Sequence, residues 1–396
     1  MDPVAMDFGP LRDDRERSQV EDILVQSFAM TPESSRAWLR KAEATGAWVE
    51  VLREKGAVTA TASLIPMGQW WWGRRVPVGG VAGVGVAPAH RGQGTAGRLM
   101  LACLQEMRAR GCVLSALYPA TQPLYRRAGF EQAGVCLEHR VRLSGIDLAE
   151  RSLSLRPVEE ADLPMLADVY LRHARSQPGW LDRGPYIWNR IQHPKGGTAN
   201  GFLVEGASGV EGYLFLTRRE VSLDHKQELN LSDLVALTPA AGRRLLSFLG
   251  DHRSLGVEVV WLGGPSHPLL FLLREQSHQM ALRCYWMLRV LDVAGALQAR
   301  GYPPGLSAAL HLEVEDDLFP ENQGRFVLEV EGGEAEVRRG GEGDLKLHAR
   351  ALAPLFSGFL SPTALHLAGA LSADEATLRT AESIFSGPAP AMPDMF

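Results

Sequence analysis

The segment from Val81 to Met100 constrains the fold of this chain more than any other. An apolar run from Val81 to Ala87 ends at Pro88, a glycine-rich loop follows, and apolar residues then recur at every third or fourth position. The first pattern predicts a buried β-strand and the last an amphipathic helix. Glycines that expose the backbone N–H groups at the start of a helix form a cradle for phosphate groups. The segment therefore predicts a phosphate-binding strand, loop and helix.

The glycines of this loop fit three kinds of phosphate-binding sequence. Gly92–Gly97 reads as G-x-G-x-x-G, but a dinucleotide-binding loop follows its strand directly and has an acidic residue about 20 positions later. The next strand-like run, Val113–Tyr118, contains no acidic residue. A Walker A loop needs Lys and then Ser or Thr after its last glycine, and these are absent there. The remaining pattern, R-x-x-G-x-A, is matched by Arg91, Gly94 and Ala96, and it resembles the acetyl-coenzyme A signature of the GNAT acyltransferase superfamily. The structural alternative is a glycine-rich turn before an ordinary core helix.

Composition and charge exclude several classes of protein. A chain of 396 residues with 45% hydrophobic and 22% charged residues has the content of a soluble protein of two or three domains. Its net charge of -5 argues against a nucleic-acid-binding protein, which would carry a basic face. Its four cysteines and scattered histidines lack the spacing of disulfide frameworks or metal sites, so no metal is expected.

Nothing in the sequence indicates export or a membrane span. The first residues include Asp2, Asp7 and Asp13 rather than the basic and then apolar stretches of a signal peptide. No run of about 18 apolar residues is present. We therefore expect a cytoplasmic protein without a transmembrane helix.

The first 150 residues alternate strand and helix patterns, which predicts a mixed sheet with helices on both faces. The adjacent residues Trp70, Trp71 and Trp72 lie in an expected hairpin and must point to both faces of it, so both core packing and an interface are open to them. Strands are expected at 48–52, 57–65, 81–87, 113–118 and up to 143, and helices at 21–28, after Gly94 and at 122–127.

The remaining chain predicts two further domains. After an expected linker at Arg151–Pro157, residues to 290 repeat a similar order of elements, but Val235–Leu246 lacks the R-x-x-G-x-A pattern where a phosphate loop would return. We expect a degenerate GNAT-like domain at 151–290 without a cofactor site. Residues 291–396 place strand patterns before helix patterns, which predicts a smaller α+β domain. The fold class is thus α+β and α/β, with tandem GNAT domains first. The proline-rich end, 387–396, reads most simply as a frayed tail.

One phenol is placed for acid catalysis. Acetyl transfer to an amine needs a neutral amine, donors for the acetyl carbonyl and a proton for the leaving thiolate. Tyr125 follows the predicted strand beside the phosphate loop and is expected to supply that proton. The segment Leu124–Phe130 is similar to the L/I-Y-x-R-x-G-F/Y segment of GNAT enzymes. The structural alternative is that Tyr125 only packs against Phe130.

These motifs together resemble the enhanced intracellular survival (Eis) acetyltransferases, which have an active GNAT domain, a degenerate one and a sterol-carrier-like domain. The resemblance covers nearly the whole chain and is most specific at 84–97, 115–130 and 284–293. It implies acetyl-CoA as the co-substrate, a small amine as the acceptor and a homo-oligomer, often a hexamer, whose interface Trp70–Trp72 would suit. It also implies that the terminal carboxylate of Phe396 acts as general base. A free α-carboxyl has a pKa of about 3.5, and burial would raise it.

The resemblance also assigns binding residues by matching positions. The backbone of the strand would pair with the pantetheine arm, the loop would hold the pyrophosphate, and two residues before the helix of Tyr125 would line the reactive end. Phe28 and Trp38 keep the aromatic character of the acceptor pocket. The family's acidic pocket position is replaced near Met30, and Asp394 is expected to compensate. The implied acetyl-CoA residues are Val84, Gly85, Val86, Arg91, Gly92, Gln93, Gly94, Thr95, Ala96, Gly97, Ala120 and Thr121.

Three functions are therefore compared. The leading one is an acetyl-CoA-dependent N-acetyltransferase of small amines, aminoglycosides among the candidates. A second is acetylation of a protein lysine or N-terminus, which an open cleft would favour. A third is a lipid-binding or scaffold protein with a vestigial GNAT domain. The intact loop at Arg91–Ala96 argues against the third.

Overall fold

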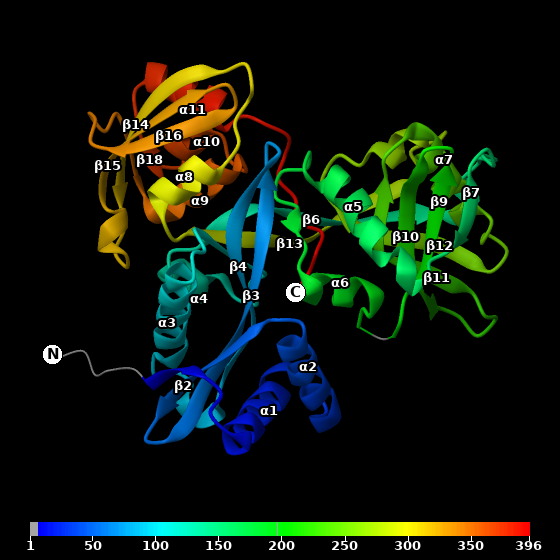
Figure 1. Ribbon diagram of the computed structural model, residues 1–396, viewed down its shortest axis with the longest axis horizontal. Helices are drawn as coiled ribbons and strands as arrows, with labels where there is room; N and C mark the ends of the chain where they lie inside the picture. Colours follow the sequence, from blue (N-terminus) through cyan, green and yellow to red (C-terminus); the bar gives the residue numbers. More distant parts are fainter. Residues whose placement is uncertain (1–6, 196) are drawn as a thin grey trace.

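The computed structural model describes residues 7–195 and 197–396, so Asp2 lies outside the described residues. The chain folds into three lobes that meet where the last residues lie (Figure 1). The helices α1 and α2 of the first lobe lie below the centre of the view and its strands β3 and β4 rise through it, the second lobe lies on the right and the third at upper left. The tail from the third lobe returns to the junction and ends beside α6.

The first lobe follows the predicted order of elements; α1, β2, β3 and β4 are longer than expected, and β5 is shorter. Helix α1 begins after Asp13, whose carboxylate accepts the N–H of Glu16 at 2.8 Å. Helix α2 was not predicted; Thr31 caps it and Pro32 occupies its first position, a common helix start. The elements are β1 (Asp7–Pro10), α1 (Asp14–Phe28), α2 (Pro32–Ala44), β2 (Trp48–Glu54), β3 (Ala57–Trp71), β4 (Arg74–Val86), α3 (Thr95–Ala109), β5 (Leu114–Leu117), α4 (Gln122–Arg127) and β6 (Glu131–Arg142).

The second lobe repeats this plan. The linker expected at Arg151–Pro157 is wrong in its second half, because Ser154–Pro157 forms a strand that pairs with β9. Its alternation is too short to be recognised without that partner. The elements are β7 (Ser154–Pro157), α5 (Leu163–Ala174), β8 (Leu181–Asp182), α6 (Pro185–Gln192), β9 (Asn200–Gly206), β10 (Gly209–Glu220), β11 (Gln227–Ala236), α7 (Pro239–Gly250), β12 (Gly256–Gly263) and β13 (His278–Val290).

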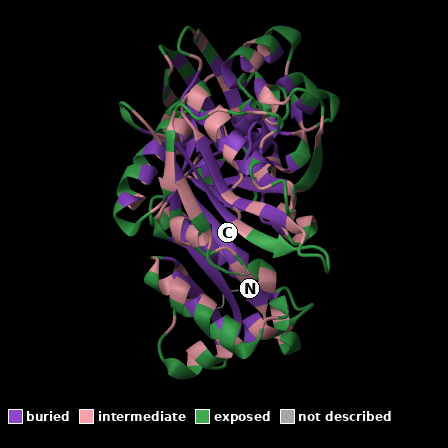
Figure 2. Cartoon of the chain, turned by 90° about the vertical axis from the view of Figure 1, so that its right-hand side faces the viewer, coloured by how far each residue is buried: buried purple, intermediate pink, exposed green. Residues whose placement is uncertain are grey.

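One 13-stranded sheet joins these two lobes. Strand β13, from the end of the second repeat, lies between β5 and β6 of the first, with Leu288 opposite both Ala116 and Glu131. Strand β6 pairs with β12 along its other edge. The buried strands run through the middle of the molecule (Figure 2). The first repeat therefore completes its sheet only with a strand supplied from about 140 residues further along the chain, beyond its own last strand β6.

The third lobe has a five-stranded sheet in the order β16-β15-β14-β17-β18 with helices against it. Its helix α11 is capped by Asp374, which accepts the N–H of Thr377 at 2.7 Å. The α+β prediction for this domain is confirmed. The elements are α8 (Val293–Ala299), β14 (Ser307–Glu315), β15 (Gly324–Glu331), β16 (Glu334–Arg339), β17 (Leu345–His348), α9 (Ala349–Ser357), α10 (Pro362–Leu367), β18 (Leu371–Ser372) and α11 (Glu375–Phe385).

The three adjacent tryptophans lie at the junction between lobes of the same chain. Trp71 is fully buried and meets Phe356 of α9 edge-to-face, with ring centroids 5.5 Å apart. Trp72 is 38% exposed, and its Nε1 donates to the carbonyl of Ser386 at 3.1 Å. Trp70 is also buried. Two of the three rings thus pack inside the chain, as the core-packing alternative expects, and Trp72 is the one of the three that stays partly exposed.

The proline-rich tail is ordered against the sheet, so its interpretation as a frayed end is wrong. Ala391 forms a parallel bridge with Val135 of β6. Met392 is fully buried, and its N–H donates to the carbonyl of Val135 at 3.3 Å. Prolines cannot extend a ladder, which is why the sequence of this tail gives no strand signal although the tail follows the sheet.

Candidate active site

The predicted phosphate loop connects β4 to α3 and leaves the start of that helix open. Gly92 and Gly94 have φ angles of 74° and 76°, in the region that favours glycine. Gly94 is the N-cap of α3 and offers no side chain to the helix. The first backbone N–H groups of a helix have no partner within it, so in this helix they remain available to an anion.

Side chains of the loop bond to the loop's own carbonyls rather than to the helix start. Arg91 Nε donates to the carbonyl of Val86 at 3.2 Å, and Gln93 Nε2 donates to that of Ala89 at 2.9 Å. The hydroxyl of Thr95 donates to the carbonyl of His90 at 3.1 Å. These bonds brace the loop, and a loop that is already shaped for its ligand has a lower entropy cost of binding.

A cavity of about 420 Å³ lies against this loop. An added Cβ at Gly97 would meet nothing within 4 Å, so this face of α3 is open. Sequence reasoning missed Leu318 because it belongs to the third lobe and nothing local connects it to the loop. Predicted residues in the lining are Val86, Arg91, Gly92, Gly94, Thr95, Ala96 and Gly97, and unpredicted ones are His90, Leu101, Leu124, Arg127, Ala128 and Leu318.

Strands β4 and β5 diverge beside the cavity. Their last pair in parallel register is Gly80 with Ala116, although β4 continues to Val86. Among the described residues no strand pairs with this edge of β4 beyond Gly80, so Val84–Val86 present an unpaired edge there. A free strand edge can accept an extended amide-containing ligand as an added strand.

Tyr125 lies on α4, which follows β5 after a short loop. Its side chain packs against Phe130, with ring centroids 6.0 Å apart, and the residue is 6% exposed. Burial raises the pKa of its phenol, so the hydroxyl stays protonated at neutral pH. The ring of Tyr125 therefore packs as the structural alternative expects. Its hydroxyl is also protonated, which the predicted acid role requires. Ala120 and Thr121 lie exposed in the loop between β5 and α4.

Phe396 reaches the point where β4 and β5 diverge. Its ring lies edge-to-face on that of Tyr118, with centroids 5.5 Å apart. A Cβ added at Gly80 would lie 2.9 Å from Cε2 of Phe396, so the phenylalanine ring occupies the space that the glycine leaves. Phe396 and Gly80 therefore lie together at the point where β5 leaves β4.

The predicted acceptor residues Phe28 and Trp38 lie on the neighbouring helices. Phe28 ends α1 and is 47% exposed. The ring of Trp38, from α2, lies over Gly83 of β4, where a Cβ would come within 2.7 Å of its Cη2. Trp38 thus faces the part of β4 where its register with β3 shifts, whereas Phe28 presents an open aromatic surface.

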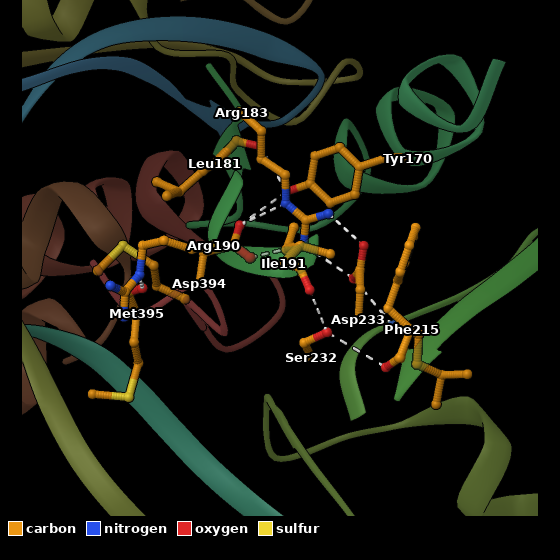
Figure 3. A network of polar contacts seen from close by, with 12 residues as sticks. Tyr170, Leu181, Arg183, Arg190, Ile191, Phe215, Ser232, Asp233, Asp394 and Met395 are labelled. Atoms are coloured by element: carbon orange, nitrogen blue, oxygen red, sulfur yellow. Dashed lines mark hydrogen bonds and ion pairs between the residues drawn. The ribbon is translucent and has the colours of Figure 1, made fainter. Parts of the chain in front are cut away.

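Asp394 does not compensate for a missing acidic pocket residue, and that expectation is wrong. Its carboxylate is buried and accepts hydrogen bonds from Arg183 at 2.7 and 2.9 Å (Figure 3). Two cationic residues lie close to each other beside the tail. Arg190 bonds to the carbonyl of Met395, and its charge, together with burial, lowers the pKa of Lys41 on α2. The sequence could not reveal this pairing, because Arg183 belongs to the second lobe.

The corresponding helix of the second lobe starts differently. Thr238 caps α7, and its hydroxyl oxygen accepts the N–H of Ala241 at 3.1 Å. That hydroxyl donates to Glu211 at 2.5 Å, which brings a carboxylate to the start of the helix. A capped helix with a carboxylate at its N-terminus neither exposes the same donors nor attracts a pyrophosphate group.

Three models of protein domains match the chain. Acetyltransferase (GNAT) domain models match residues 11–133 and 179–290, and a sterol carrier protein domain model matches residues 293–393. Within the described residues, none of the helices has the length and apolar character that crossing a bilayer takes. Nor do three or more potential metal-ligating side chains gather at one place in residues 7–195 and 197–396.

Named relatives cover most of the chain. An uncharacterized N-acetyltransferase from Streptomyces griseus is 30% identical over 360 residues, which cover 82% of this chain and 83% of that protein. N-acetyltransferase Eis from Mycobacterium tuberculosis (strain ATCC 25177 / H37Ra) is 26% identical over 341 residues, covering 80% and 79%. The crystal structure of a GCN5-related N-acetyltransferase from Anabaena variabilis matches with a TM-score of 0.93 and 36% identity, covering 99% of this chain and 100% of that one. These findings confirm the predicted fold class and the family resemblance.

Proposed function

Because the chain belongs to the Eis-like GNAT N-acetyltransferases, with two GNAT domains and a sterol carrier domain, we propose that it transfers the acetyl group of acetyl-CoA to the amino group of a small amine. GNAT acetyltransferases use acetyl-CoA as co-substrate, and the residues of the first domain fit it. The open start of α3 would take the pyrophosphate, and the free edge of β4 at Val84–Val86 would pair with the pantetheine amides. The capped helix α7 supports a single donor site, in the first domain.

Two groups would carry out the proton transfers of this reaction. The amine attacks the thioester carbonyl as its proton leaves, and the departing thiolate needs a proton. Tyr125, kept protonated by burial, would donate that proton to the sulfur. If intact-mass analysis shows that the protein ends at Phe396, the α-carboxylate of Phe396 would accept the proton of the amine. The observation that carries this assignment is the position of the Phe396 ring beside Gly80, where the strands of the donor site diverge.

The acceptor would be a small amine held beside the aromatic surfaces of Phe28 and Trp38. Aminoglycosides are candidates, but Asp394 is paired with Arg183, and Lys41 and Arg190 add positive charge nearby. We therefore expect amines of low charge to be better substrates than polycationic ones. Assembly into a homo-oligomer, as a hexamer or otherwise, stays a prediction that mass photometry can test, and a cytoplasmic location stays one as well.

The test extends the chain beyond Phe396 by three glycines. Thiol release from acetyl-CoA is measured across a panel of monoamines, polyamines and aminoglycosides, after intact-mass analysis has established Phe396 as the last residue. We expect the extended protein to lose at least a hundredfold in kcat while its Kd for acetyl-CoA, from titration calorimetry, stays unchanged. A matched extension at the N-terminus is the control. Full turnover by the C-terminally extended protein would exclude the carboxylate as base, and silence of the native protein with every amine would contradict the proposed function.

A further inference from the structure

A buried charge network holds the tail two residues before Phe396. Arg183, which follows β8, donates to Asp394 at 2.7 and 2.9 Å and to Asp233 of β11 at 2.5 and 3.0 Å. The side chain of Arg183 is 1% exposed and those of the two aspartates are 4% exposed each. Figure 3 shows the guanidinium between the two carboxylates. One arginine thus bridges the second GNAT domain to the tail.

Every part of this network is fixed by further contacts. The guanidinium lies over the ring of Tyr170, 3.5 Å from its centroid. Asp233 accepts the hydroxyl of Tyr213 at 2.7 Å. On the tail side, Arg190 Nε donates to the carbonyl of Met395 at 2.8 Å. The tail is therefore held at two consecutive residues by side chains of the second domain.

Fold stability alone is a poor explanation for such a network. Removing three charged groups from water costs more than their mutual attraction commonly returns, and apolar residues in their place are often as stable. What a bidentate pair adds is a defined geometry. Since a residue spans at most about 3.6 Å of extended chain, fixing Asp394 and Met395 confines Phe396 to within about 7 Å of Asp394.

The network lies at the position in the second domain that corresponds to the donor site of the first. Strands β11 and β12 run parallel only as far as Asn230 and Val260, just as β4 and β5 do to Gly80 and Ala116. Asp233 lies on the diverging part of β11, and Pro393–Met395 line a cavity of about 290 Å³ there together with Arg183 and residues of β12. The strand divergence that we propose as the donor site in the first domain is thus, in the second domain, where the tail lies.

We infer that Arg183 and Asp394 are positioning residues, and that the second GNAT domain serves as the dock that aims Phe396 into the first. This inference rests on the proposed function for its catalytic consequence, but the docking itself stands on the contacts above. It gives the domain without a donor site a specific task, which is to hold the tail that carries the proposed base.

The test is Asp394→Asn, which removes one charge and leaves the Arg183–Asp233 pair in place. Two measurements are made on the full-length protein: steady-state kinetics, and the rate at which a carboxypeptidase selective for aromatic C-termini releases Phe396, followed by intact mass. We expect at least a tenfold fall in kcat, an unchanged KM for acetyl-CoA and at least tenfold faster release. Asp394→Glu keeps the charge, so it should restore part of kcat and part of the protection of Phe396 from release. Asp251→Asn, in an exposed pair with Arg151, is the matched control.

The outcomes separate this inference from the proposed function. A protected Phe396 and normal kcat in Asp394→Asn would overturn the inference, as would loss of its cooperative thermal transition, because Asp394 would then be needed for folding. If release is faster but the protein extended beyond Phe396 keeps full turnover, the docking stands and the carboxylate is not the base. Faster release with lower kcat in Asp394→Asn, and an inactive extended protein, would support both.

Discussion

Phe396 rests edge-to-face on Tyr118, and the hydroxyl of Tyr118 donates to the carbonyl of Met392 in the same tail. Tyr118 directly follows β5 of the first domain, so one residue both receives the terminal ring and holds the segment leading to it. The pKa of its phenol lies well above its usual range because the side chain is buried. Tyr118 therefore stays neutral and serves the tail as a hydrogen-bond donor.

Tyr125→Phe should separate packing from acid catalysis. The ring contact with Phe130 remains, so the melting temperature should change by less than about 2 °C, whereas loss of a general acid lowers kcat by roughly 10²–10⁴-fold. Burial raises the pKa of this phenol, so Tyr125 stays protonated through neutral pH. The kcat of the wild-type protein should therefore not fall through deprotonation of Tyr125 in that range. Tyr285→Phe on β13 is the control. A kcat within threefold of wild type would leave Tyr125 only its packing role.

Gly97→Ala should move stability and donor affinity in opposite directions. An added methyl meets nothing within 4 Å in the protein, and alanine stabilises a helix relative to glycine by up to about 1 kcal/mol. The same methyl would stand where the pyrophosphate approaches α3. We expect a slightly higher melting temperature together with at least tenfold weaker binding of acetyl-CoA by calorimetry. Gly305→Ala, also in open space, should leave affinity unchanged. Unaltered affinity in Gly97→Ala would place the pyrophosphate elsewhere.

Glu16→Gln should lower stability in a pH-dependent way. Arg53 holds the carboxylate with bonds of 2.6 and 2.8 Å and lowers the pKa of Glu16 from 4.5 to about 2. The folded state thus binds this proton less readily than the unfolded state, so the stabilisation is full above pH 4.5 and disappears as pH falls towards 2. Urea unfolding should show a loss of up to about 3 kcal/mol at pH 7, shrinking as the pH is lowered. Glu375→Gln in an exposed pair is the control, and an equal loss at pH 7 and pH 3 would contradict this account.

Trp71→Ala should destabilise the chain by about 3–5 kcal/mol, since a fully buried ring is removed. Trp72→Ala, at a 38% exposed position, should cost much less. Both losses are measured by urea unfolding at two protein concentrations. Packing within one chain makes the loss independent of concentration, whereas a subunit contact would make it depend on concentration.

Local patterns were sufficient for the parts of the fold that depend on neighbouring residues. Helix α4 spans the predicted 122–127, and the phosphate loop lies where its glycines placed it. Distant pairings were different: the place of β13 between β5 and β6 depends on partners far away in the sequence. The short strand β7 gives too little alternation to be recognised without β9.

The residues of the site and of the tail also fall into those that local sequence could locate and those that it could not. The loop and the unpaired end of β4 could be located because each belongs to one contiguous segment, whereas the role of Tyr125 stays a prediction. Leu318, which lines the cavity from the third domain, and Arg183, which holds the tail from the second, could not be located, since each acts across a domain boundary. The role expected of Asp394 was wrong for a related reason: an acidic residue in a sequence does not show whether a buried arginine already holds it.

The position of β13 also sets when this enzyme can fold. Until residues 278–290 have left the ribosome, β5 and β6 lack the strand that lies between them, and the N-terminal domain exposes two unsatisfied edges. Pairing over such long sequence separations is slow and leaves edges open to aggregation. We therefore expect the acetyl-CoA site, although encoded in the first third of the chain, to be among the last parts of the molecule to form.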